Sequence, residues 1–409
     1  MLKTEFYETA VQRGFYGTER SGLYGKKDNV RKYWEDVFIK LSIRPALEHI
    51  LQQKEKIRVL DLGCGGGEGI ELLTHIPPHD PLTTRHKDFL LTKADLELYK
   101  GIDISPAMIN QGKENYPNYP QIQFLQADLG KGFPCTTDAP YDIYFSSYSS
   151  LSHLTYQELQ QLTRQIFTHV GERGYMVFDL HGRFSPQWPK YWGASCQRQL
   201  PYNMAYLLPP DEQVPENFDW FNLTYWSGEE LIQLIESTAR ATHRTAQILT
   251  IQDRSILVGR HMDTCIFKPE RHYFRRQVNR LFDLDYRGEL NKLDADLDYL
   301  NDVKDIHPQA WQRIVEYGRQ WQKVVCMVQL LMSSKNAEVK KFIESQTELI
   351  AEELKMLAWL YRNAERFPVV DFWASIMGPQ VACVLRNLEL NLPRGLGCGH
   401  GLFCLVEIT

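Results

Sequence analysis

One glycine-rich stretch, RVLDLGCGGGEG at residues 58–69, restricts the choice of fold more than any other part of the sequence. Val59, Leu60 and Leu62 predict a short buried strand, and the helical pattern EGIELLTHI follows the glycines. Glycines at five of the seven positions from 63 to 69 exceed what an ordinary strand-to-helix turn requires. Glycine lets a ligand approach the backbone, and a helix N-terminus offers unpaired N–H groups. The stretch therefore predicts the loop of a nucleotide-type cofactor site in an α/β fold.

Details of this loop separate the candidate cofactors. The dinucleotide pattern G-x-G-x-x-G fails, because Glu68 stands where the third glycine is required, and its carboxylate would repel a pyrophosphate. The P-loop pattern fails because no lysine follows the glycines. The hydrophobic run that ends in Asp61-x-Gly63-x-Gly65 resembles the first motif of class I methyltransferases that depend on S-adenosylmethionine (SAM). In that family the loop packs on the methionine part of a cofactor that carries no phosphate.

Two later acidic residues extend the resemblance. Asp103 lies in a predicted strand, just before the helix start Ser105-Pro106, and Asp128 follows a predicted strand at 121–127. The resemblance, which covers about residues 1–260, implies that Asp103 binds the ribose hydroxyls and that Asp128 accepts from the adenine amino group. The cofactor site expected from these motifs and their neighbours consists of Asp61, Gly63, Cys64, Gly65, Asp103, Ile104, Met108, Asp128, Leu129 and Ser146. The expected cofactor is SAM, with S-adenosylhomocysteine (SAH) as product.

The predicted fold class is α/β, with a Rossmann-like class I methyltransferase sheet that is mostly parallel and has an antiparallel last strand. A mainly helical block is added to this sheet. The expected parts are an N-terminal helical or lid segment (1–56), a cofactor-binding core (57–262), the helical block (263–392) and a final strand (393–409). In the favoured layout, the block is inserted before GLGCGHGLFCLVEIT returns to the sheet. In the competing layout, RSILVGRHM finishes the sheet and a separate helical domain follows.

The segment 184–226 is unusually aromatic, and in the resembling family the region after the fifth strand builds the acceptor site. Trp188 and Trp192 are therefore candidate acceptor contacts, with Arg183 as a partner for a carboxylate. Tyr16 and Tyr24 are expected to cover the site from the N-terminal segment. The alternative is that most of these aromatic residues form a core between two domains.

Candidate bases lie at the tips of the fourth and fifth predicted strands. His181 is the first choice, because it follows the fifth strand and histidine titrates near neutrality. His153 and Tyr148 are further candidates. The alternative for His181 is a loop histidine that only forms hydrogen bonds. No metal site is predicted.

Net charge and cysteine spacing restrict the classes of function to consider. The 409 residues carry a formal net charge of −5, and the eight cysteines are scattered without a C-x-x-C pair. These features favour a cytoplasmic protein with reduced thiols that binds neither nucleic acid nor a membrane. The predicted activity is methyl transfer from SAM to O or N of a small-molecule acceptor, of the kind found in specialised metabolism. The alternatives are a protein- or carrier-bound acceptor and a SAM-binding relative without methyl transfer. The helical block is a candidate homodimer surface.

Overall fold

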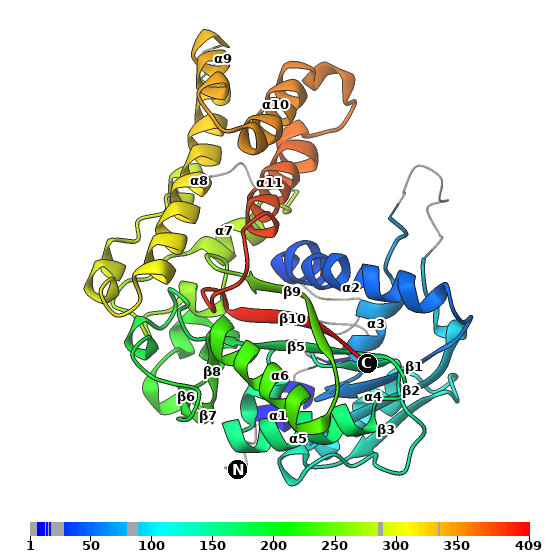
Figure 1. The fold of residues 1–409 in the computed structure, drawn as a ribbon. Helices are drawn as coiled ribbons and strands as arrows, with labels where there is room; N and C mark the ends of the chain where they lie inside the picture. The colour runs from blue at the N-terminus through cyan, green and yellow to red at the C-terminus, as the bar shows by residue number, and fades with distance from the viewer. Residues whose placement is uncertain are drawn as a thin grey trace.

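An eight-stranded sheet forms the centre of the molecule (Figure 1). The computed structural model describes residues 6–12, 14, 16–17, 28–79, 89–284, 289–333 and 336–409. The strand order is β3-β2-β1-β4-β5-β10-β9, and β8 pairs with β5. These strands are β1 (Ile57–Leu62), β2 (Leu96–Asp103), β3 (Ile122–Gln126), β4 (Ile143–Phe145), β5 (Gly174–Gly182), β8 (Tyr225–Trp226), β9 (Ala246–Arg254) and β10 (Gly401–Ile408). A second sheet pairs β6 (Leu200–Tyr202) with β7 (Phe221–Leu223).

Strands β1 to β5 are parallel, and β10 runs antiparallel between β5 and β9. This arrangement confirms the predicted fold class, including the antiparallel last strand. The competing layout placed the run RSILVGRHM (254–262) in the sheet. Only its first residue, Arg254, belongs to a strand, and the rest forms a loop that enters the turn η9 (Arg260–Asp263).

Helices cover both faces of the sheet, because alternate residues of each strand point to opposite sides. On β5, Val177 packs with α2 (Asp36–Leu51) and α3 (Glu68–Thr74), whereas Phe178 packs with α5 (Tyr156–His169) and α6 (Gly228–Thr242). The helix α1 (Phe6–Gln12) lies against α4 (Pro106–Asn115). The sheet is thus buried on both sides, which explains the apolar runs of its central strands.

The glycine-rich segment before β10 passes close to several backbones. A Cβ on Gly395, Gly397 or Gly399 would lie between 2.3 and 2.7 Å from a backbone atom of a neighbouring segment. The carboxylate of Asp253 accepts hydrogen bonds from the backbone N–H groups of residues 396, 397 and 398. These glycines therefore let the returning chain pack between β9 and the end of β8.

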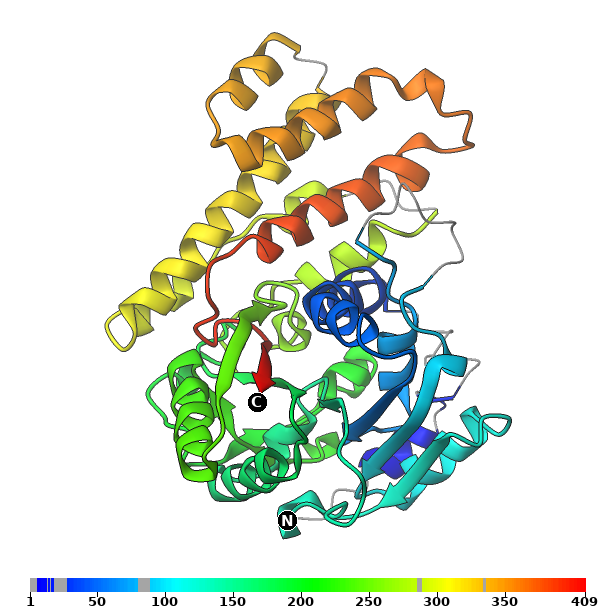
Figure 2. The ribbon, with the colours of Figure 1, turned by 45° about the vertical axis from the view of Figure 1, so that its right-hand side comes forward.

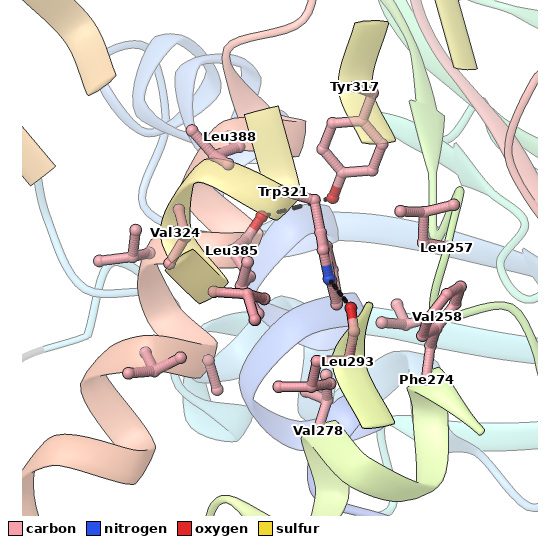
Figure 3. Packing of buried hydrophobic residues seen from close by; sticks show 14 of the residues in the cluster. Leu257, Val258, Phe274, Val278, Leu293, Tyr317, Trp321, Val324, Leu385 and Leu388 are labelled. Carbon is pink, nitrogen blue, oxygen red and sulfur yellow. Dashed lines mark hydrogen bonds between the residues drawn. The ribbon is translucent and has the colours of Figure 1, made fainter. Parts of the chain in front are cut away.

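The residues between β9 and β10 contain a helical block that rises away from the sheet (Figures 1 and 2). Its helices are α7 (Phe274–Arg280), α8 (Pro308–Met332), α9 (Asn336–Glu344), α10 (Glu348–Arg362) and α11 (Gly378–Leu390). Trp321 on α8 is fully buried at the base of the block, and its Nε1 donates to the Leu293 carbonyl at 2.8 Å (Figure 3). None of the described helices is long and apolar enough to cross a membrane.

Candidate functional site

A cavity of about 1110 Å³ opens at the carboxyl ends of the central strands. In α/β sheets this edge is where ligands bind, and single small-molecule sites usually measure roughly 300–1,000 Å³. The cavity extends from the glycine loop after β1 to the ends of β5 and β9. The predicted site residues that line it are Tyr16, Gly63, Cys64, Gly65, Asp103, Ile104, Met108, Asp128, Leu129, Tyr148, His153 and His181.

The glycine loop forms one wall of the cavity because its backbone adopts conformations that side chains disfavour. Gly63, Gly65 and Gly67 have φ values of 80°, 54° and 92°. A Cβ on Gly63 would lie 2.4 Å from the Cβ of Ser150. The loop therefore leaves room for a ligand directly against the backbone.

Asp103, at the end of β2, lines the cavity beside this loop. Its Oδ2 accepts from the Gly65 N–H at 3.0 Å, and its Oδ1 accepts from the Ser105 N–H at 2.9 Å. Each oxygen retains a lone pair for a further donor. Burial raises the pKa of this carboxyl, while the two backbone donors oppose that rise. Asp128 is held in a similar way, because its Oδ1 accepts from the Gly130 N–H at 2.9 Å.

Two residues predicted to contact the cofactor lie outside the cavity lining. Asp61 is 1% exposed beneath α3, where it accepts a hydrogen bond from the Tyr99 hydroxyl and leaves no room for a side chain at Gly69. Ser146 is fully buried. Neither residue lines the cavity, so direct contact of either with the cofactor stays a prediction. Asp61 supports the loop from behind, so the motif residue acts on the site through packing.

The far end of the cavity is lined by three histidines, His153, His181 and His400. Burial lowers the pKa of His181 to about 3 and that of His153 to about 4, so both rings are neutral. The Nε2 atom of His153 lies 2.8 Å from the Tyr7 hydroxyl. Together these residues form a neutral, hydrogen-bonding end to the cavity.

The bonding partners of His181 and His400 determine their tautomers. A backbone carbonyl can only accept, so Nδ1 of His181, at 3.1 Å from the His400 carbonyl, carries the proton. Nδ1 of His400 lies 3.1 Å from Oε1 of Gln187, and that oxygen already accepts from the His261 backbone N–H. Nδ1 of His400 is therefore also the donor. In both rings Nε2 is left as a hydrogen-bond acceptor.

Tyr148 lines the cavity, but its functional groups are engaged with neighbouring residues. Its hydroxyl donates to Asp36, and its backbone N–H donates to Asp179 Oδ2 at 2.7 Å. Arg31 lies over the ring at 3.6 Å from its centroid. Tyr148 has a φ of 53°, and strained backbone of this kind is common at functional sites. Burial raises the pKa of the hydroxyl well above its ordinary value. With its hydroxyl bonded to Asp36 and its pKa raised, Tyr148 is not arranged as a base in this structure.

The structure does not bring the predicted acceptor contacts of the aromatic segment to the cavity. Trp188 and Trp192 are buried, and their indole N–H groups donate to the carbonyls of Gly182 and Ser185. Arg183 is paired with Glu230 through contacts of 2.6 and 2.7 Å. None of the three lines the cavity: the two indoles are packed in the core, and Arg183 is held by its ion pair with Glu230. Tyr24 lies outside the described residues.

The aromatic segment 184–226 contributes Tyr202, Tyr206 and Phe221 to the lining. Further lining residues that the sequence did not identify are Tyr7, Arg31, Arg254, Arg260 and His400. Arg254 ends β9 and His400 precedes β10. A polar residue at the end of a predicted strand is what identified Asp103, and the same criterion applies to these two residues. Tyr7 and Arg260 come from a short helix and a turn that no motif marks.

Comparisons with known proteins agree with this geometry. Residues 89–174, from just before β2 to the start of β5, match the family model described as a methyltransferase domain. No curated protein matches the chain.

Solved structures with similar folds were also found. A SAM-dependent methyltransferase from Mesorhizobium loti is 16% identical, with a TM-score of 0.33 over 53% of this chain and 85% of that chain. One from Clostridium acetobutylicum is 13% identical, with a TM-score of 0.35 over 60% and 90%. A Haloferax volcanii methyltransferase in complex with the Trm112 activator is 14% identical, with a TM-score of 0.33 over 63% and 83%. Similarities this low carry no inference about activity.

The matched segment contains β2, β3 and β4, which carry or adjoin Asp103, Asp128 and Tyr148 at the cavity. The sheet order and the glycine loop after β1 complete the pattern around it. Residues 89–174 of this chain thus match a methyltransferase domain, within a sheet of Rossmann-like order.

Proposed function

We propose that this protein transfers a methyl group from SAM to an oxygen or nitrogen atom of a small-molecule acceptor. The observation that carries the proposal is the single cavity that joins the glycine loop and Asp103 to the neutral ring of His181. Its volume of about 1110 Å³ exceeds the roughly 300–1,000 Å³ of a usual single-ligand site. The cavity therefore offers room for a cofactor and a small acceptor side by side.

The cofactor end has the groups that SAM requires. Asp103 has free lone pairs for the two ribose hydroxyls, and the loop at Gly63 and Gly65 gives access to the backbone. Glu68 lines the same end, where a carboxylate favours a cationic ligand. When bound, SAM supplies an activated methyl group on a sulfonium.

At the other end, the chain's own residues hold the acceptor. Nε2 of His181 accepts a hydrogen bond from the O–H or N–H of the nucleophile and directs its lone pair toward the methyl group. Orientation of this kind supplies much of the rate of an in-line displacement. With a pKa of about 3, His181 is a weak base, so it acts chiefly as an orienting acceptor. His153, held by Tyr7, is proposed to limit the space beside it.

The test is calorimetric titration of the protein with SAH, with NAD as the control ligand. Binding of SAH in the micromolar range, about −8 kcal/mol, without binding of NAD supports the proposal. Failure to bind SAH contradicts it. SAH formation during a screen of small hydroxylated and amino acceptors then tests turnover, and transfer only to a protein- or carrier-bound acceptor would contradict the small-molecule class.

A further inference from the structure

The two ends of the cavity differ in the charge of their walls. The cofactor end carries the carboxylates Glu68, Asp103 and Asp128. Toward the acceptor end, the charged lining residues among the described ones are Arg31, Arg254 and Arg260, with the carboxyl of Asp28 beside Arg260. Buried arginines are unusual unless paired, so their partners decide whether they are available to a ligand.

Arg254 is paired with carboxylates of the fold. Its Nη2 donates to both oxygens of Asp179, at 3.0 and 2.8 Å, and its side chain is 1% exposed. It also lies 3.4 Å from Glu35. Arg254 thus forms the charged floor of the acceptor end. Its Nε and Nη1 have no hydrogen-bond partner among the described residues, but its side chain is only 1% exposed, whereas that of Arg260 is 14% exposed.

Arg260 is held much more loosely. Its Nη2 lies 3.4 Å from Glu35 Oε2, and its Nη1 lies 3.9 Å from Asp28. Both carboxylates have shorter bonds to Arg275, which donates from Nη1 to Glu35 at 2.9 Å and from Nε to Asp28 at 3.2 Å. A guanidinium has five N–H donors, and among the described residues Arg260, which lines the cavity, has one hydrogen bond, to Glu35.

A second guanidinium faces the same space. Arg31 lines the cavity, and its nearest carboxylates, Asp36 and Glu68, are 3.8 and 3.9 Å away, beyond hydrogen-bond distance. The charges of Arg31 and Arg260 disfavour each other. An anion placed between them would relieve this repulsion and satisfy their free N–H groups.

The surrounding walls are aromatic. Tyr206 lies under the Arg260 guanidinium at 5.3 Å from the ring centroid, and Tyr202 lies 4.9 Å from the His181 ring. Phe221 stacks on His153 at 5.3 Å. Flat walls of this kind suit a planar ring.

We propose that the acceptor is a small aromatic carboxylic acid with a ring hydroxyl or amino group, and that Arg260 binds its carboxylate. The ring packs against Tyr202 and Tyr206, and the hydroxyl or amino group donates to Nε2 of His181. This inference rests on the proposed methyl transfer and adds the class of acceptor. The methionine carboxylate of SAM is the other carboxylate that these arginines are able to bind.

The experiment uses ligand-observed NMR on the complex of the full chain with SAH. The probes are the three hydroxybenzoate isomers and the matching neutral hydroxybenzamides. We expect at least one acid to bind about tenfold or more tightly than its amide, as a charged hydrogen bond predicts. In Arg260→Gln this preference is lost, and in Arg260→Lys it is partly retained. The control Arg240→Gln, whose side chain on α6 is 73% exposed, keeps the full preference.

SAH affinity, measured by calorimetry on the same variants, separates the two carboxylates. An unchanged SAH affinity in Arg260→Gln supports binding of the acceptor. A tenfold loss of SAH affinity assigns Arg260 to the cofactor and overturns the inference. It is also overturned if acids bind no better than amides, or if Arg260→Gln keeps the preference. Failure of the wild type to bind SAH would instead contradict the proposed function.

Discussion

Asp103 and Asp61 lie in neighbouring parallel strands but differ in their access to the cavity. Asp103 ends β2 and lines the cavity, whereas Asp61 lies inside β1 and is sealed behind the loop. The first has backbone donors on both oxygens, and the second has the Tyr99 hydroxyl on one oxygen. We therefore expect Asp103 to act in ligand binding and Asp61 to contribute to the pH dependence of folding.

Asp103→Asn is expected to weaken SAH binding. The amide keeps the size of the side chain but offers a donor where the ribose hydroxyls need an acceptor. A lost pair of charge-assisted bonds costs about 1.5–3 kcal/mol, or roughly 10- to 150-fold in affinity. Calorimetric titration measures the change, with exposed Asp211→Asn as the control. An SAH affinity equal to that of the wild type would remove Asp103 from the ribose site.

Asp61→Asn is expected to change the pH dependence of stability. Burial raises the pKa of Asp61 from its ordinary value of 3.8 to about 7. Its stabilising contribution is therefore complete below about pH 4 and is lost as the pH rises through about 7. The variant has no carboxyl to ionise at this position. The difference in free energy of unfolding between variant and wild type should therefore shift in favour of the variant by about 2–4 kcal/mol from about pH 4.5 to pH 7.5. Urea unfolding at both pH values measures it, and a constant difference would show that Asp61 titrates normally.

At the scale of elements, the sheet brings distant residues to one point through register. On β10, Gly401 pairs with His181 of β5 and with Arg254 of β9. The ion pair between Asp179 and Arg254 therefore crosses β10 at Gly401, where no side chain intervenes. Gly401, the last glycine of the GLGCGHG segment, thus leaves the space in which β5 and β9 form their ion pair.

Gly401→Ala is expected to destabilise the chain. The new Cβ would lie 2.6 Å from Asp179 Oδ1 and 2.7 Å from Arg254 Nη2. Crowding a buried ion pair should cost about 2–4 kcal/mol in the free energy of unfolding. The matched control is Gly193→Ala, whose Cβ would have no neighbour within 4 Å. Urea unfolding of both variants measures the difference. Equal stabilities would mean that the Asp179–Arg254 ion pair can move aside without a loss of free energy.

The strands and the glycine loop could be predicted from the sequence more reliably than the side chains that line the cavity. The β1 loop and Asp103 were identifiable because each motif is contiguous and lies at a strand end. The acceptor end combines Tyr7, Arg260 and His400, which only the tertiary fold brings together, so no local pattern marked it. The aromatic segment was misassigned in part, because composition does not show which rings face the cavity and which fill the core.

At the scale of the whole molecule, the helical block shares one hydrophobic cluster with the N-terminal segment and with the loop after β9. Trp34, just before α2, packs in the same cluster as Trp321 of α8 and Leu385 of α11. The Trp34 indole N–H donates at 2.8 Å to Glu389, whose carboxylate also accepts from the backbone N–H groups of residues 255 and 256. Residue 255 in turn bonds to Glu35 through its hydroxyl, next to the arginines of the acceptor end. The block is thus continuous with the wall of the cavity.

A cavity made inside the block should therefore destabilise the sheet as well. Leu385 is fully buried, and Leu385→Ala should cost about 2–5 kcal/mol. Because this cluster and the Glu389 bonds tie the block to the segment that follows β9, we expect one unfolding transition and faster hydrogen exchange in β5 and β10 as well as in α11. Leu349→Ala on α10, where the side chain is 46% exposed, is the control and should change stability by less than about 0.5 kcal/mol. Two separate transitions, with exchange in β5 and β10 unchanged, would show that the block unfolds as an independent domain.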